Sequence, residues 1–234
     1  SGSADLTLDE AASTFGALAI TGANVAVTEN AAMDLGASTI SGTASFNSTS
    51  NAITDSGTLA ITGATTLNSG SADLTLDQSA STFGTLAITG ANVAVTENAA
   101  MDLGASTISG TASFNSTSNA ITDSGTLAIT GATTLNSGSA DITLNEAAST
   151  FGTLAITGTN VAVTENAAMD LGASTISGTA SFNSSNNAIT DSGTLAITGV
   201  TTLNSGSADL TLDEAASTFG ALAITGANVA VTEN

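Results

Sequence analysis

The chain of 234 residues has no lysine, arginine or histidine, and its twenty aspartate and glutamate residues give a formal net charge of −20. Binding to a nucleic-acid backbone depends on Lys and Arg to displace counterions, so that class of function is excluded. The same charge disfavours docking onto anionic membrane surfaces. Salt bridges between side chains cannot form, so the acids must find their counter-charge in solvent cations, metals or a partner.

Tyrosine, tryptophan and cysteine are absent as well. Because His, Lys and Arg are also missing, a serine nucleophile has no ordinary base, and no cationic side chain can stabilise an oxyanion or a phosphate. Two carboxylates can hydrolyse glycosides, and adjacent acids occur at Asp9 and Glu10 and again at Asp213 and Glu214. The equivalent pair is Asp-Gln in the second copy of this segment and Asn-Glu in the third, so it is not kept. We expect a protein that is not an enzyme.

The remaining absences concern folding and location. Without cysteine there is no disulfide framework, and no apolar run approaches the roughly 18 residues of a membrane-spanning helix. Proline is also missing, which suits strands that donate hydrogen bonds to both neighbours. The sequence starts without an initiator methionine or a signal peptide. We therefore expect a window from a longer chain, whose targeting signals lie outside it.

What the chain does have is a near-perfect internal repeat. Residues 1–68, 69–136 and 137–204 are three copies, and residues 205–234 begin a fourth that is identical in sequence to positions 1–30. Such a period indicates a solenoid, a propeller or a string of modules. We interpret residues 1–234 as a single continuous solenoid.

A shorter pattern lies inside each copy. The segment Gly-Ala-Leu-Ala-Ile-Thr-Gly at 16–22 recurs in related form at 36–42 and 57–63, and large apolar residues alternate with small or polar ones between these segments. Alternation over three to five residues predicts short strands with one buried face. Helix is disfavoured, because each of the 24 glycines would cost a helix interior about 1 kcal/mol relative to alanine.

Three short strands between successive segments of this kind predict one triangular turn of a parallel β-helix. We predict about three turns in each copy and about ten in all. One turn of each copy, such as the one from Gly57 to Gly84, is expected to be enlarged by a bulge equivalent to residues 8–16. The interior columns expected from this register are Ile20, Ile40 and Ile61; Val27, Phe46 and Leu67; and Leu35, Ile53 and Leu76.

Other all-β folds fit the pattern less well. A left-handed β-helix needs strict six-residue steps, whereas the steps here vary from six to eight, so we predict a right-handed coil. Propeller blades need about 40–50 residues, and tandem β-sandwich modules need about 100 residues with larger aromatic side chains.

The Gly-x-[Leu/Ser]-[Ala/Thr]-Ile-[Ser/Thr]-Gly pattern, followed by Asn-x-Val-x-Val or Ala-Ser-Phe-Asn, resembles the repeats of filamentous-haemagglutinin-type adhesins and autotransporter passengers. Members of those families are secreted right-handed β-helices of bacterial surfaces. The resemblance covers the whole chain as a pattern, and it implies fold and location more than any partner.

Polar residues give few candidates for a site. Calcium takes six to eight oxygen ligands, and the candidates here are Asp9, Glu10, Asp213 and Glu214, although no known calcium-loop motif is present. The simpler interpretation of the acids is a solvated acidic face. The recurring asparagines, such as Asn47 and Asn68, fit turns whose amides satisfy backbone groups. Asn47 also begins a formal glycosylation triplet.

Together these features predict the structural shaft of an extracellular bacterial fibre or giant adhesin, with no cofactor unless calcium is bound. Self-association end to end or side by side is expected, without nucleic acid and without membrane insertion. The alternative is an acidic module that binds calcium or a surface glycan. An ice-binding surface would need a regular threonine array, for which only a short row (Thr21, Ser41 and Thr62) is available.

Overall fold

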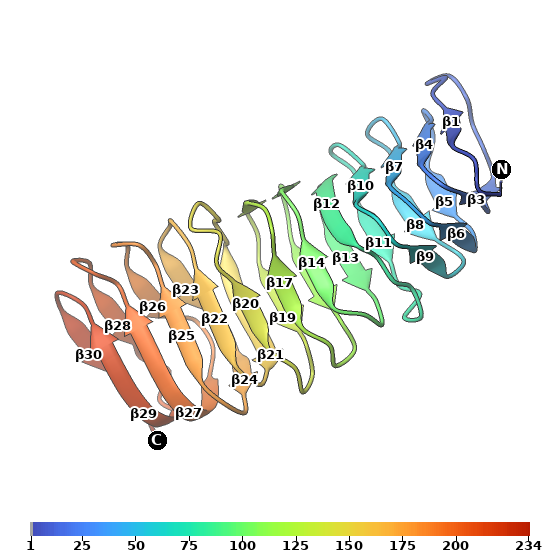
Figure 1. The fold of residues 1–234 in the computed structure, drawn as a ribbon. Coiled ribbons are helices and arrows are strands. Elements are labelled where there is room, and N and C mark those ends of the chain that lie inside the picture. The colour runs from blue at the N-terminus through green and yellow to red at the C-terminus, as the bar shows by residue number, and fades with distance from the viewer. Residues whose placement is uncertain (1) are drawn as a thin grey trace.

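The computed structural model describes residues 2–234, which form a parallel β-solenoid of about 11 turns (Figure 1). The described residues contain no helix, and hence none that could cross a membrane. The two chain ends lie at opposite ends of an elongated rod (Figure 1). The predicted all-β parallel solenoid is thus confirmed; its right-handed sense stays a prediction.

Most turns contain three short strands. The first copy contains β1 (Leu6–Leu8), β2 (Ala17–Leu18), β3 (Thr21–Gly22), β4 (Val25–Thr28), β5 (Met33–Leu35), β6 (Ser38–Ile40), β7 (Ala44–Asn47), β8 (Ile53–Asp55), β9 (Leu59–Ile61) and β10 (Thr65–Asn68). The second contains β11 (Leu74–Leu76), β12 (Thr85–Gly90), β13 (Val93–Thr96), β14 (Met101–Leu103), β15 (Ser106–Ile108), β16 (Ala112–Asn115), β17 (Ile121–Asp123), β18 (Leu127–Ile129) and β19 (Thr133–Asn136). The third contains β20 (Ile142–Leu144), β21 (Thr153–Gly158), β22 (Val161–Thr164), β23 (Met169–Leu171), β24 (Ser174–Ile176), β25 (Ala180–Asn183), β26 (Ile189–Asp191) and β27 (Leu195–Asn204). The partial fourth copy contains β28 (Leu210–Leu212), β29 (Thr218–Thr225) and β30 (Val229–Val231).

These strands pair in parallel, and each pairing joins one turn to the next. One continuous ladder runs through twelve strands: β1, β4, β7, β10, β12, β14, β17, β20, β22, β25, β27 and β29. At about 4.8 Å per strand spacing, the rod is roughly 50 Å long. Interior strands have partners on both sides, so their backbone groups are satisfied within the chain.

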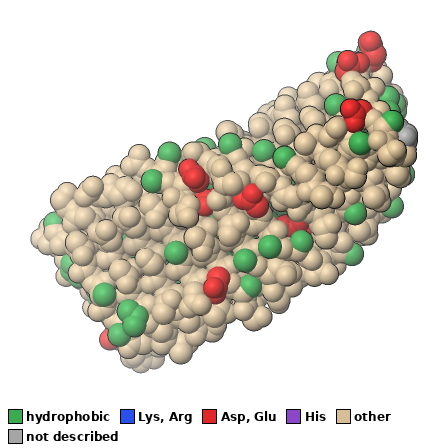
Figure 2. Space-filling view, in the orientation of Figure 1, with side chains coloured by type: hydrophobic (Ala, Val, Ile, Leu, Met, Phe, Trp, Pro, Cys, Tyr) green, Lys and Arg blue, Asp and Glu red, His purple; other side chains and the backbone are tan. Residues whose placement is uncertain are grey.

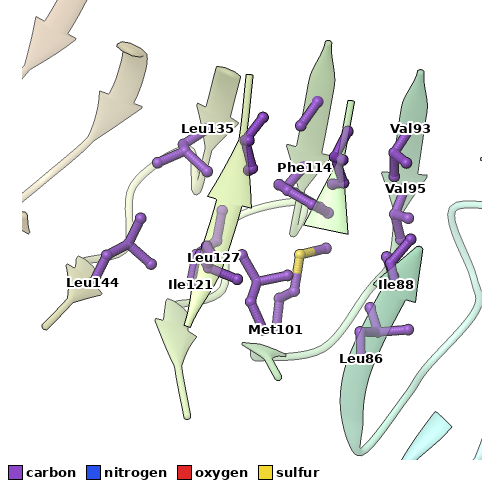
Figure 3. Close-up of a cluster of buried hydrophobic side chains, with 14 of the residues drawn as sticks. Leu86, Ile88, Val93, Val95, Met101, Phe114, Ile121, Leu127, Leu135 and Leu144 are labelled. Carbon is purple, nitrogen blue, oxygen red and sulfur yellow. The ribbon is translucent and has the colours of Figure 1, made fainter. Parts of the chain in front are cut away.

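The interior is a narrow column of mostly aliphatic side chains, in which Phe46, Phe114 and Phe182 occupy equivalent positions in the three complete copies. Within the three-residue strands the outer two side chains face inward and the middle one faces outward, as in β6 and β9. The predicted stack of Val27, Phe46 and Leu67 is confirmed, because the three residues are direct partners. Figure 3 shows the same stack in the second copy, where Phe114 lies between Val95 and Leu135.

The other two predicted columns are wrong in register. Leu35 pairs with Asp55, whereas Ile53 pairs with Met33 and Leu74. In the first column Ile40 and Ile61 are partners as predicted, but the partner of Ile40 one turn earlier is a glycine, Gly22. Side chains alternate with a period of two, so a slip by two positions leaves the same set of side chains inside. The hydrophobic pattern therefore defines the face and leaves the register open.

A single copy does not span a whole number of turns. Val25 opens β4, and the equivalent residue of the second copy, Val93, opens β13. Val93 stacks on Leu74, Ile53 and Met33, which is the column that β5 starts on the next face. The third and fourth copies repeat this step, with β22 above β14 and β30 above β23. Each copy thus overshoots three turns by about one strand.

This overshoot shows that the predicted enlarged turn is wrong. Partner residues in successive turns are as close in sequence as Thr85 and Asp102 and as far apart as Ala60 and Thr82, which is shorter than the step from Gly57 to Gly84. The bulge residues do not enlarge a turn, because the next copy's Leu86 stacks on Thr65 of the neighbouring face and not on Leu59. The total is therefore about 11 turns instead of ten.

Asn47 and Asn68 hold corners, as predicted, but their side chains bond inside their own turn. Asn47 and Asn68 are stacked partners. The Asn47 Oδ1 accepts the Thr49 N–H at 3.1 Å, and the Asn68 Oδ1 accepts the Gly70 N–H at 2.9 Å. These are local turns in which an asparagine side chain replaces a backbone acceptor two residues before the donor.

One buried hydroxyl in each copy offers a test of the core. Thr133 is fully buried between Ala112 and Leu154, and its Oγ1 has no hydrogen-bond partner in the described chain. A buried polar atom without a partner costs about 1–3 kcal/mol. We therefore expect Thr133→Val to stabilise the rod by about 1 kcal/mol in urea unfolding. Thr134→Val on the exposed neighbour should change little, and equal effects of the two variants would contradict the prediction.

Candidate functional site: an acid-held corner loop

The segment in which the copies differ most forms a loop at one corner of the solenoid. We define the corner loops as residues 9–15, 77–83, 145–151 and 213–219, each of which follows a Leu-Thr-Leu or Ile-Thr-Leu strand. In all four loops a backbone hydrogen bond closes a tight turn, as from the Ser81 N–H to the Gln78 carbonyl at 2.8 Å. The loops carry the predicted calcium candidates.

The calcium candidates lie at exposed positions. Asp9, Glu10 and Asp213 are exposed and Glu214 is partly buried. Among residues 2–234 no group of three or more Asp or Glu side chains comes close enough together to hold a metal ion. Calcium binding therefore stays a prediction that depends on a partner, a second rod or solvent to complete the ligand set.

An aspartate from the preceding turn holds the start of each later corner loop. The Asp55 carboxylate accepts the N–H groups of Asp77 at 2.8 Å and of Gln78 at 3.3 Å. Asp123 and Asp191 make the same pair of bonds to the third and fourth loops. Burial raises the pKa of Asp55 above its ordinary value, although the two N–H donors act in the opposite direction. The acid is thus a structural cap for the loop.

A glutamate from the following strand holds the end of the loop. The Oε2 of Glu97 accepts the Phe83 N–H at 2.9 Å, and the equivalent bonds are Glu29 to Phe15 at 2.8 Å and Glu165 to Phe151 at 3.0 Å. All three glutamates have a relative exposure of 0%. In each of them the second carboxyl oxygen, Oε1, is buried without a hydrogen-bond partner in the described chain.

Burial changes the protonation of Glu97 and Glu165. It raises the pKa of Glu97 and of Glu165 to about 8, and the bond from the phenylalanine N–H only partly opposes this. With no Lys, Arg or His in the chain, no positive side chain can offset the cost of burying the charge. At neutral pH both side chains are therefore mainly neutral acids inside the rod.

The buried glutamates were missed by the sequence interpretation, which placed the acids on a solvated face. A signal was present, because Glu29 continues the alternation of Val25 and Val27 and so shares their inward direction. The composition argument outweighed it, since an unpaired acid is rarely buried.

The other acids fit the predicted outer surface and also link neighbouring turns. The Asp5 Oδ1 accepts the Asn24 side-chain amide at 3.0 Å, and the Asn24 Oδ1 accepts the Thr43 N–H at 3.0 Å. The outward Asp102 accepts hydroxyls from Thr85 at 2.7 Å and Ser124 at 2.9 Å. Figure 2 shows acids on one face of the rod, set singly or in small groups among neutral side chains.

These acids do not line a pocket, since none was found in the part of the chain that the structure describes. A comparison with protein families matched residues 22–89, 90–157 and 158–232 to repeats of unknown function (DUF5649). The chain belongs to the DUF5649 repeat family. The first two matches divide the chain with the same period as the sequence copies, at Gly22 and Gly90. Comparisons with curated proteins and with solved structures gave no match.

Proposed function

We propose that this DUF5649 solenoid is a non-catalytic shaft of an extracellular bacterial fibre or giant adhesin. One observation carries the proposal: parallel pairing joins each turn to the next, from β1 at one end to β29 and β30 at the other, around a continuous hydrophobic interior. A rod of this kind can serve as a long, stiff spacer. Its sequence has no His, Lys, Arg or Cys, and so lacks the nitrogen bases, cationic groups and thiols that many active sites use.

Several features support an extracellular location. The absence of Lys and Arg removes every site at which trypsin-like proteases cut. The pattern resembles repeats of secreted bacterial adhesins, as described above. Near-identical copies allow length to change by whole units, because the stability of a solenoid is approximately a sum over neighbouring repeats.

Self-association is part of the same proposal. The net charge of −20 keeps rods apart in low salt, so lateral contact depends on screening or on cations between rods. No nucleic-acid partner and no membrane insertion are proposed. The alternative of an ice-binding surface is not favoured, because Thr21 pairs with Thr39 instead of Ser41 and so does not extend the row expected from Ser41 and Thr62.

Immunogold labelling tests the location and the role. Antibodies raised against residues 1–234 should label filaments outside intact, non-permeabilised cells of the source bacterium, with labels spread along the filament. Labelling that appears only after the cells are permeabilised would contradict the proposal. Melting in calcium and in a chelator tests the alternative of a calcium-binding module, which requires the two melting temperatures to differ.

A further inference from the structure

We propose that Glu97 and Glu165 form a pH-sensitive latch, which keeps the corner loops 77–83 and 145–151 closed in acid and lets them open as the pH rises. The latch is one hydrogen bond in each loop, from a phenylalanine N–H to a glutamate Oε2 at 2.9 Å and 3.0 Å. It secures the loop at the residue whose aromatic ring enters the core, since Phe83 and Phe151 are 5% exposed. The inference is independent of where the rod functions.

The geometry makes this bond depend on protonation. The carboxyl group has no exposed surface, and its Oε1 has no donor among the described residues. Ionisation would place a full charge there without compensation, which is strongly unfavourable in a protein interior. Opening the corner loop is the shortest way to bring water to Oε1, because the loop is the segment that Glu97 bonds through its side chain.

Nearby charged groups do not rescue the ionised form. Glu97 follows β13, which pairs with β11 and β16, and the titratable groups on or next to these elements and the loop are Asp73 before β11, Asp77 in the loop, Asp55 bonded to the loop, and Asp102 on β14, the next strand in the chain. Around Glu165 they are Asp141, Glu146, Asp123 and Asp170. All are acids and the chain has no Lys, Arg or His, so no positive side chain can stabilise the ionised glutamate.

The direction of the pH effect follows from linkage. The pKa of Glu97 is about 8 in the closed rod, against 4.5 for a glutamate in water. An open loop therefore releases a proton that the closed loop keeps throughout this range. The contribution of the protonated Glu97 to the stability of the closed loop is fully present below pH 4.5 and is lost as the pH rises to about 8. Within the range the open population should rise by about tenfold per pH unit.

Hydrogen–deuterium exchange on the full chain measures this opening. The second and third corner loops differ in sequence, so their peptides are distinguishable by mass. After correction for intrinsic exchange, protection of the Phe83 and Phe151 N–H groups should fall by about tenfold per pH unit between about pH 5 and 8. In Glu97→Gln, protection of Phe83 should be nearly independent of pH, while Phe151 keeps the slope of the wild type.

Glu146→Gln is the matched control. It removes an acid from the third corner loop, where the second copy already has Gln78, so the loop should fold normally and Phe151 should keep its slope. A wild-type chain with flat protection at both phenylalanines would overturn the proposal. So would an unchanged Phe83 slope in Glu97→Gln. If that variant fails to fold, the wild-type chain still tests the proposal, because the protection of Phe83 and Phe151 should fall with pH more steeply than that of the Ile121 N–H, which lies outside the corner loops.

Discussion

Replacing Phe114 with alanine is expected to destabilise the second copy by about 3–5 kcal/mol. Phe114 is 1% exposed and is among the largest fully buried side chains of the rod. It lies between Val95 and Leu135, whose positions are set by backbone pairing to neighbouring turns, so they cannot close the cavity without breaking those bonds (Figure 3). Urea unfolding followed by circular dichroism measures the loss.

Ser113→Ala is the control for Phe114→Ala, because Ser113 lies on the same strand with its side chain exposed. It should change stability by less than about 0.5 kcal/mol. Unfolding of a solenoid need not be two-state, so hydrogen exchange of strands β13, β16 and β19 should accompany the urea data. A Phe114→Ala loss below about 1 kcal/mol would show that the column is not closely packed.

The second large effect is expected from Gly125→Ala at the corner between β17 and β18. A methyl group at Gly125 would lie 2.2 Å from the backbone nitrogen of Ala105 and 2.8 Å from its Cα, in the turn beneath. The obstructing atoms are backbone, so no rotamer change relieves the contact. Adjacent turns would have to separate at this corner, at a cost of about 3 kcal/mol, the upper end of the usual range for overpacking.

Gly16→Ala isolates the steric cause. A Cβ at Gly16 meets no atom within 4 Å, so this variant should retain the stability of the unmodified chain. Melting temperature and far-ultraviolet circular dichroism compare the two variants. Equal behaviour of Gly125→Ala and Gly16→Ala would mean that the turns are not in backbone contact at this corner.

The two-residue periodicity of strands determines how much of this fold can be predicted from the sequence. Alternating side chains identified the strands and their buried faces, and the stack of Val27, Phe46 and Leu67 was predicted to the residue. Register elsewhere was not predictable, since a slip by two positions at a corner preserves every buried face. The turn count failed for the same reason, because the next copy moves to a new face instead of enlarging one turn.

The acids that hold the corner loops were not predicted from the sequence. Asp9 and Glu10 drew attention to the corner loop, and their side chains are exposed as expected for a loop tip. The acids that hold the later loops are Asp55, Asp123 and Asp191 from the turn beneath and the glutamates from the strand above. These partners are distant from the loop in sequence, so only the register, which the pattern does not fix, brings them to it.

Because each copy exceeds three turns by about one strand, the number of copies sets the direction in which the next segment points as well as the length of the rod. Adding one copy lengthens the rod and also rotates the azimuth of whatever follows by about a third of a revolution, because three strands complete a turn and each copy starts one strand further on. Only additions of three copies restore the original heading. Two variants that differ by a single copy would thus present the same distal segment toward different sides.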